Sequence, residues 1–206
     1  SVEDVASGRP PVAEPGLANL YTAHGERISA TLDPQAAIDG TQASFIVVPT
    51  PSKPSGEFDT RHAVDVARQI GNALRTKTET HLVVLSSTVG AGATERDIIP
   101  ALEEGSGKRV GSEILLCCSP EFIALGDVIA GLLHPDFFLI GEHTRDAGDA
   151  MESVYRQVGG DSAVMARMSI VNAEVVKIAI NSFVTLKISF ANTLARLCAR
   201  LPGGDA

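Results

Sequence analysis

The sequence lacks tryptophan, and only 4% of its 206 residues are aromatic, so its core must be built mainly from Val, Ile, Leu and Ala. Positive charge is also scarce: 17 Lys and Arg stand against 25 Asp and Glu, a formal net charge of −8. Nucleic acids and anionic membrane surfaces are bound by clustered Lys and Arg. We therefore expect no nucleic-acid or membrane partner, and any anionic ligand must be held locally.

Cysteine is rare as well. Cys117, Cys118 and Cys198 have no metal-ligand spacing and form no disulfide framework, so we expect no metal site and a reducing cytoplasm. No apolar stretch of about 20 residues is evident, and the first residues, SVEDVASGRPP, do not resemble a signal peptide. The expected location is the cytosol.

Short apolar runs alternate with longer amphipathic segments along most of the chain. This pattern is typical of an α/β fold, a doubly wound parallel sheet with helices on both faces. The expected strands are Ser44 to Thr50, His81 to Thr88, Ile114 to Pro120, Phe137 to Gly141 and, more weakly, Arg27 to Thr31. The expected helices are Leu17 to His24, Asp33 to Asp39, Thr60 to Arg75, Thr94 to Glu104 and Thr144 to Val158. Asp33 and Asp59 are suitable helix caps.

From Ser169 to Leu201 the pattern changes to one helical run without Pro or Gly, about 48 Å long if continuous. Apolar residues surround it almost completely, so we expect it to be buried between two bodies. The expected division is a domain over residues 1–168 and a long central helix, a dimerisation region, over residues 169–206.

Polar residues on this helix recur every three or four positions and so form one stripe. They are Lys177, Asn181, Thr185, Ser189, Asn192 and Arg196. A buried amine such as that of Lys177 needs a partner. One interpretation is an internal ion pair with Glu174 or Glu121, and the other is a ligand site.

Two further segments carry polar groups at expected strand ends. Glu121 follows a strand within Ser-Pro-Glu-Phe, where a carboxylate at the sheet's carboxyl edge is able to relay a proton. Ser86, Ser87 and Thr88 end the preceding strand and offer hydroxyls. Each also has an ordinary explanation as a capping or turn residue.

Taken in order, the motifs resemble the UDP-glucose/GDP-mannose dehydrogenase family over nearly the whole chain. They are EPGL (Glu14 to Leu17), FIVVPTP (Phe45 to Pro51), SSTV (Ser86 to Val89), SPEF (Ser119 to Phe122), PDFFLIG (Pro135 to Gly141) and AEVVKIAINSFVTLKISFANTLARLC (Ala173 to Cys198). The last block is the most specific.

The resemblance implies a Rossmann-like NAD-binding domain and a reaction. Two hydride transfers to two NAD⁺ convert the C6 alcohol of a nucleotide sugar to a carboxylate through a cysteine thioester. It implies catalytic roles for Thr88, Glu121, Lys177 and Asn181, and cofactor contacts by Pro49, Thr50, Ser87, Thr88 and Glu121. It implies substrate contacts by Glu121, Phe122, Ile123, Lys177 and Asn181, and a homodimer formed through the 169–201 helix.

The chain also departs from the family pattern. The usual first βαβ unit with its GxGxxG turn and the C-terminal domain with the nucleophilic cysteine are absent, so we expect this chain alone to be inactive. Leu125 stands where many members have a second Glu, and Gly90 replaces a usual Pro.

UDP-glucose is the expected substrate, and a UDP-N-acetylhexosamine is the next candidate. Two other interpretations stay open: a non-catalytic dimerisation or nucleotide-binding module, and a dehydrogenase of the 6-phosphogluconate type.

Overall fold

The computed structural model describes residues 2–122 and 126–205. Within them, five strands form one sheet in the order β1-β2-β3-β4-β5. The strands are β1 (Ala43–Ile46), β2 (His81–Leu85), β3 (Ile114–Cys118), β4 (Phe138–Glu142) and β5 (Met165–Ser169). The helices are α1 (Val2–Ala6), α2 (Leu17–His24), η1 (Gly25–Arg27), α3 (Pro34–Asp39), α4 (Arg61–Leu74), η2 (Thr94–Ile98), α5 (Ile99–Ser106), α6 (Val128–Leu133), α7 (Arg145–Gly159) and α8 (Ile170–Cys198).

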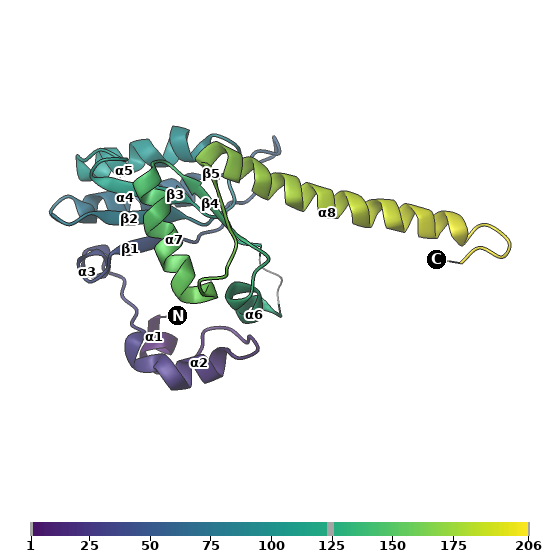
Figure 1. Cartoon of the computed structure of the whole chain (residues 1–206), viewed down its shortest axis with the longest axis horizontal. Coiled ribbons are helices and arrows are strands. Elements are labelled where there is room, and N and C mark those ends of the chain that lie inside the picture. The colour runs from purple at the N-terminus through teal and green to yellow at the C-terminus, as the bar shows by residue number, and fades with distance from the viewer. Residues whose placement is uncertain (1, 123–125, 206) are drawn as a thin grey trace.

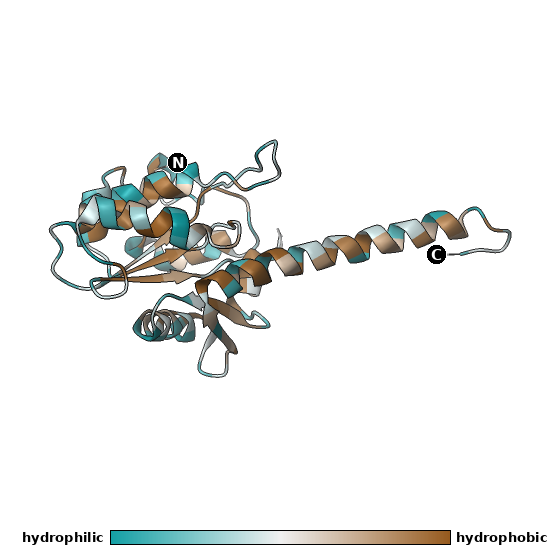
Figure 2. Ribbon diagram, turned by 90° about the horizontal axis from the view of Figure 1, so that it is seen from above, coloured by the Kyte–Doolittle hydropathy of each residue, from teal (hydrophilic) through white to brown (hydrophobic). Residues whose placement is uncertain are grey.

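The sheet is covered on both faces, as the near-continuous apolar strands predict. Successive residues of β2 point to opposite faces: Val83 and Leu85 pack in the core under α4 and α5, whereas Leu82 and Val84 pack in the core under α7. Figure 2 shows the strands as a largely hydrophobic layer between helices. The α/β architecture expected from the sequence is confirmed.

The predicted helix starts are correct in detail at α3. Asp33 is the N-cap, its carboxylate accepts a hydrogen bond from the Gln35 amide at 2.9 Å, and Pro34 occupies the first turn. At α4, Asp59 accepts from the Arg61 amide at 3.1 Å and also pairs with the Arg61 guanidinium, while Thr60 is the N-cap residue.

Three expectations about the sheet are wrong. The sheet is not wholly parallel, because β4 runs antiparallel to β3, with Cys117 opposite Glu142. The weak strand expected at residues 27–31 is instead the end of η1 followed by irregular chain.

The third error is β5, which the sequence pattern does not predict because Arg167 interrupts its apolar residues. The Arg167 guanidinium is neutralised by Glu142 at 2.6 Å, Asp149 at 2.5 Å and Glu152 at 3.0 Å, so a charged residue fits this edge strand.

Helix α8 begins on the sheet and then leaves it. At the crossing with β4 there is no space for a side chain: a Cβ on Gly141 would lie 2.6 Å from the Cβ of Ala173. The helix buries Ile170, Ala173, Glu174 and Lys177, and beyond them it extends away from the body of the molecule (Figure 1). In this single chain the helix is therefore not enclosed between two bodies as expected.

Most of α8 exposes apolar side chains, for example Phe183, which is 61% exposed. By length and composition alone the helix is also apolar enough to cross a membrane, which corrects the expectation that no stretch qualifies. Its first turns are buried against the sheet, and Lys177, Lys187 and Arg196 recur along it. Charged side chains at such intervals are costly in lipid.

Candidate functional site

Strands β1, β2 and β3 are parallel, so the segments that follow them meet at one edge of the sheet. The first two segments are joined directly, because the hydroxyl of Thr50 donates to the carbonyl of Thr88 at 2.5 Å. Both residues are half-buried, and Pro49 beside them is exposed. The structure thus brings together Pro49, Thr50 and Thr88.

The serines at the end of β2 have different roles. The hydroxyl of Ser87 accepts from the Val48 amide at 2.9 Å and lies 2.8 Å from the Val48 carbonyl, so it fastens the ends of β1 and β2 together. The hydroxyl of Ser86 is buried and, in the described part of the chain, has no hydrogen-bond partner. Burying a hydroxyl without a partner is costly. The sequence motif did not distinguish Ser86 from Ser87 and Thr88 in this respect.

Lys177 is only 8% exposed and lies against the segment that follows β3. Its ammonium donates to the backbone carbonyl of Glu121 at 2.6 Å and lies 4.6 Å from the centre of the Phe122 ring. Burial lowers the pKa of Lys177, and the nearby charge of Glu121 opposes that effect. The structure therefore brings together Lys177, Glu121 and Phe122, three of the residues predicted for the site.

Glu121 is half-buried, and burial raises the pKa of its carboxyl while Lys177 acts in the opposite direction. A carboxyl with a raised pKa is able to exchange a proton closer to neutral pH. Burial therefore disfavours the charged forms of both the Glu121 carboxyl and the Lys177 amine, and the charge of each group partly offsets that effect on the other.

The remaining predicted residues are less closely assembled. Asn181 lies one turn beyond Lys177 on α8, and its side chain is exposed. Ile123 lies outside the described residues, and so does Leu125, the position of the missing second Glu. The ion pair considered between Lys177 and Glu174 is not formed, because the Glu174 carboxylate binds the start of η2.

Tyr155 of α7 supports the Glu121 segment and had not been predicted. Its hydroxyl lies 2.5 Å from that of Ser119, and Ser119 donates to the carbonyl of Leu139 at 2.7 Å. The tyrosine ring stacks on Phe138 with 4.1 Å between centroids. Burial raises the pKa of Tyr155 to about 12, so the phenol stays protonated and donates to Ser119.

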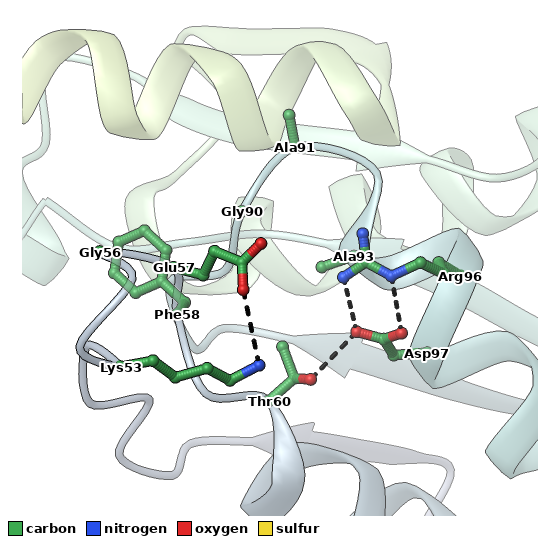
Figure 3. Close-up of a pocket in the computed structure, with 10 residues that line it drawn as sticks. All are labelled: Lys53, Gly56, Glu57, Phe58, Thr60, Gly90, Ala91, Ala93, Arg96 and Asp97. Carbon is green, nitrogen blue, oxygen red and sulfur yellow. Dashed lines mark hydrogen bonds and ion pairs between the residues drawn. The ribbon is translucent and has the colours of Figure 1, made fainter.

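A hollow of about 710 Å³ lies between residues 53–60 and 90–97, the second of which follow β2 (Figure 3). The charges on its wall are paired with each other: Lys53 with Glu57 at 3.9 Å, and Arg96 with Asp97 at 2.9 Å. The hollow is lined by none of the residues predicted for the site. A smaller hollow beside Tyr155 is lined by two of the residues predicted for the site, Glu121 and Phe122.

The cysteines behave as core residues. Burial raises the pKa of both Cys117 and Cys118 to about 12, so neither supplies a thiolate at neutral pH. Within the described residues no cluster of His, Cys, Asp and Glu is arranged to hold a metal ion.

The sheet is open, loops gather at its carboxyl edge, and a long helix carries a buried lysine to that edge. These features together are typical of a nucleotide-binding domain of the dehydrogenase type. Comparison with known proteins agrees. Residues 1–159 match the NAD binding domain of the UDP-glucose/GDP-mannose dehydrogenase family, and residues 171–206 match its central domain. The chain belongs to this family.

The relatives include enzymes with different named substrates. The chain is 36% identical over 201 residues to UDP-glucose 6-dehydrogenase AglM of Haloferax volcanii, covering 96% of this chain and 46% of that protein. It is 34% identical over 206 residues to GDP-mannose 6-dehydrogenase of Pseudomonas aeruginosa, covering 99% of this chain and 46% of that protein.

Solved structures show the same fold. A ternary complex of GDP-mannose dehydrogenase from Pseudomonas aeruginosa matches with a TM-score of 0.91 at 34% identity, over 96% of this chain and 45% of that one. A UDP-glucose dehydrogenase from Pyrobaculum islandicum matches with a TM-score of 0.87 at 36% identity, over the same shares. The chain spans less than half the length of these relatives.

Proposed function

We propose that this chain is part of an NAD-dependent nucleotide-sugar 6-dehydrogenase that oxidises the C6 alcohol of UDP-glucose to the uronic acid, a precursor for polysaccharide biosynthesis. The observation that carries the proposal is the buried amine of Lys177, held at the carboxyl edge of the sheet against Glu121. The 36% identity to a UDP-glucose 6-dehydrogenase supports the choice of sugar. Relatives named for GDP-mannose are almost as similar, so GDP-mannose is the main competitor.

The residues after β1 fit the nicotinamide half of the cofactor. Val47 is 72% exposed at the end of the strand, and exposed Pro49 and half-buried Thr50 follow it, which gives a flat ring an apolar surface with a polar margin. Pro49, Thr50, Ser87, Thr88 and Glu121 would line this part of the site. NAD⁺, when bound, accepts the hydride that leaves the C6 carbon.

The side chains around the C6 oxygen would divide the proton chemistry. The Lys177 ammonium is placed to stabilise negative charge as the alcohol loses its proton, and Asn181 would orient the oxygen. Glu121, whose pKa is raised by burial, would hold a water with Thr88 and accept its proton in the hydrolytic step. Phe122 and Ile123 would contact the sugar.

Two further parts of the proposal concern assembly and location. The exposed apolar surface of α8 is suited to a second copy of the same helix, which would make a homodimer through residues 169–201. The proposed location is the cytoplasm, which the free thiols of Cys117, Cys118 and Cys198 support.

The test is NADH formation by the full-length protein that contains this chain, assayed separately with UDP-glucose, GDP-mannose and a UDP-N-acetylhexosamine. The proposal predicts about two NADH per UDP-glucose oxidised and the highest kcat/KM for that sugar. Replacing Lys177 by Ala should lower kcat on the order of 10²-fold or more, as for loss of a group that stabilises an oxyanion. Unchanged turnover in that variant would favour the non-catalytic module instead.

A further inference from the structure

Glu174 is a buried carboxylate, 1% exposed, that has no assigned role. Its oxygens accept three hydrogen bonds, from the amide of Gly92 at 2.5 Å, the amide of Thr94 at 2.9 Å and the hydroxyl of Thr94 at 2.6 Å. All three donors are neutral groups at the start of η2. Burying a carboxylate costs free energy. Here hydrogen bonds from the amides at the start of a helix, rather than an ion pair with a cation, offset that cost.

The partners of Glu174 belong to the loop that follows Thr88. This loop contains Gly90 and Gly92, and Gly92 has a left-handed φ of +79°. A Cβ at either glycine would meet nothing within 4 Å, so the loop is short of packing contacts at both positions. Within the described residues its hydrogen bonds to α8 are those to Glu174, which connect residues 80 and 82 positions apart in the chain. Buried Val89 and Ala93 of this segment also belong to the same apolar core as Ile170 of α8.

Glu174 and Lys177 are three residues apart, so they lie on one face of α8, about 4.5 Å apart along the axis. Glu174 binds the loop after β2, and Lys177 binds the carbonyl of Glu121 after β3. The same helix face is therefore attached to two loops of the site. Beyond Lys177 the helix is mostly exposed, so in this chain these two attachments, the packing at Gly141 and the burial of Ile170 in the core fix its rotation and its height over the sheet.

We infer that Glu174 is a positioning residue that holds the Lys177 amine and the loop after Thr88 in register with each other. The inference rests on the proposed function, since it assigns the consequence to turnover. A slide or rotation of α8 by about 1 Å would displace the amine from a reacting oxygen, and misplacement of that size is expected to cost on the order of 10²-fold in rate.

Two substitutions probe the carboxylate. Glu174→Gln preserves the shape but places an amide donor against the Gly92 amide or the Thr94 amide, so one hydrogen bond is replaced by a repulsive contact. Glu174→Asp preserves the charge but shortens the side chain by one methylene. Should either fail to fold, Thr94→Val removes only the hydroxyl donor and should show a smaller change in the same direction.

The matched control is Ser106→Ala at the other end of α5. The buried Ser106 hydroxyl donates to the Leu102 carbonyl at 2.7 Å and accepts from the Lys108 amide at 3.0 Å, so its loss removes two hydrogen bonds at the opposite end of the same helical segment from Thr94. In the full-length enzyme, Glu174→Gln should lower kcat on the order of 10²-fold. Ser106→Ala should lower Tm with kcat unchanged. Equal kcat values in the two variants at similar Tm would show that Glu174 acts only as a stabilising cap of η2, and would overturn the inference.

A second readout does not depend on activity. Brief acetylation with acetic anhydride, followed by mass spectrometry, compares the rates at buried Lys177 and exposed Lys187 on the same helix. Glu174→Gln should raise the Lys177 rate severalfold relative to Lys187, and Ser106→Ala should not. An unchanged ratio of the two acetylation rates would refute the positioning role, whether or not the protein forms NADH. Absence of NADH formation by the wild-type protein would instead refute the proposed function.

Discussion

Replacing Lys177 by Met should remove activity while leaving stability almost unchanged. The thioether side chain has nearly the length of the lysine stem, so most of the buried side-chain volume is kept, without the ammonium that lies over the Phe122 ring. The charge and its hydrogen bond to the Glu121 carbonyl are lost. The change therefore separates the packing of this position from its chemistry.

The expected stability follows from opposing contributions. A hydrogen bond to a charged group is worth about 1.5–3 kcal/mol, and the contact with the Phe122 ring adds about 1 kcal/mol. Burial of the ammonium costs several kcal/mol. The lowered pKa of Lys177 indicates that this cost exceeds the coulombic stabilisation of the ammonium by the Glu121 charge. The variant should thus stay within about 1 kcal/mol of the wild type, or within about 4 °C in Tm.

The pH dependence gives a sharper test. The pKa of Lys177 is lower in the folded state than its ordinary value of 10.5. At pH values between the folded-state pKa and the unfolded-state pKa, the unfolded chain therefore binds more protons than the folded one. The free energy of unfolding of the wild type should therefore rise with pH through that window, relative to Lys177→Met. Urea unfolding of both proteins at pH 7, 9 and 10 measures the difference. A difference independent of pH, or a loss of 3 kcal/mol or more in the variant at pH 7, would refute this account of the buried amine.

Three other predictions concern the supporting structure. Tyr155→Phe should lower the free energy of unfolding by about 1–2 kcal/mol through loss of the buried hydroxyl pair, and urea unfolding would contradict it by showing no change. Gly71→Ala should lower Tm, because a Cβ there would lie 2.6 Å from a backbone oxygen of α5 and overpacking costs about 1–3 kcal/mol. The control Gly131→Ala should raise Tm or leave it unchanged, because a Cβ at Gly131 would meet nothing within 4 Å. In the native protein a thiol reagent should label Cys198 much faster than Cys117, whose pKa is raised to about 12, and equal rates would show that the core opens readily.

The sequence alone predicted the elements that depend on neighbouring residues. The strands at His81 and Ile114 are continuous apolar runs, and α3 begins at an Asp-Pro pair, as predicted. Such signals are local, because side-chain periodicity and capping act within a few residues. The direction of β4 and the presence of β5 depend on pairing with distant strands, and Arg167 within β5 is tolerated only because three carboxylates from β4 and α7 surround it.

The candidate site divides in the same way. The sequence motifs single out Lys177 and Glu121 as candidates through the family resemblance, because residue types and spacing alone leave an ordinary ion pair or capping role open. Only the fold decided which groups meet: the nearby Glu174 turns to Thr94, while Lys177 reaches a carbonyl 56 positions away. The reason is that a helix presents residues three apart to one surface, and the loops that surround that surface are brought there by the topology of the sheet.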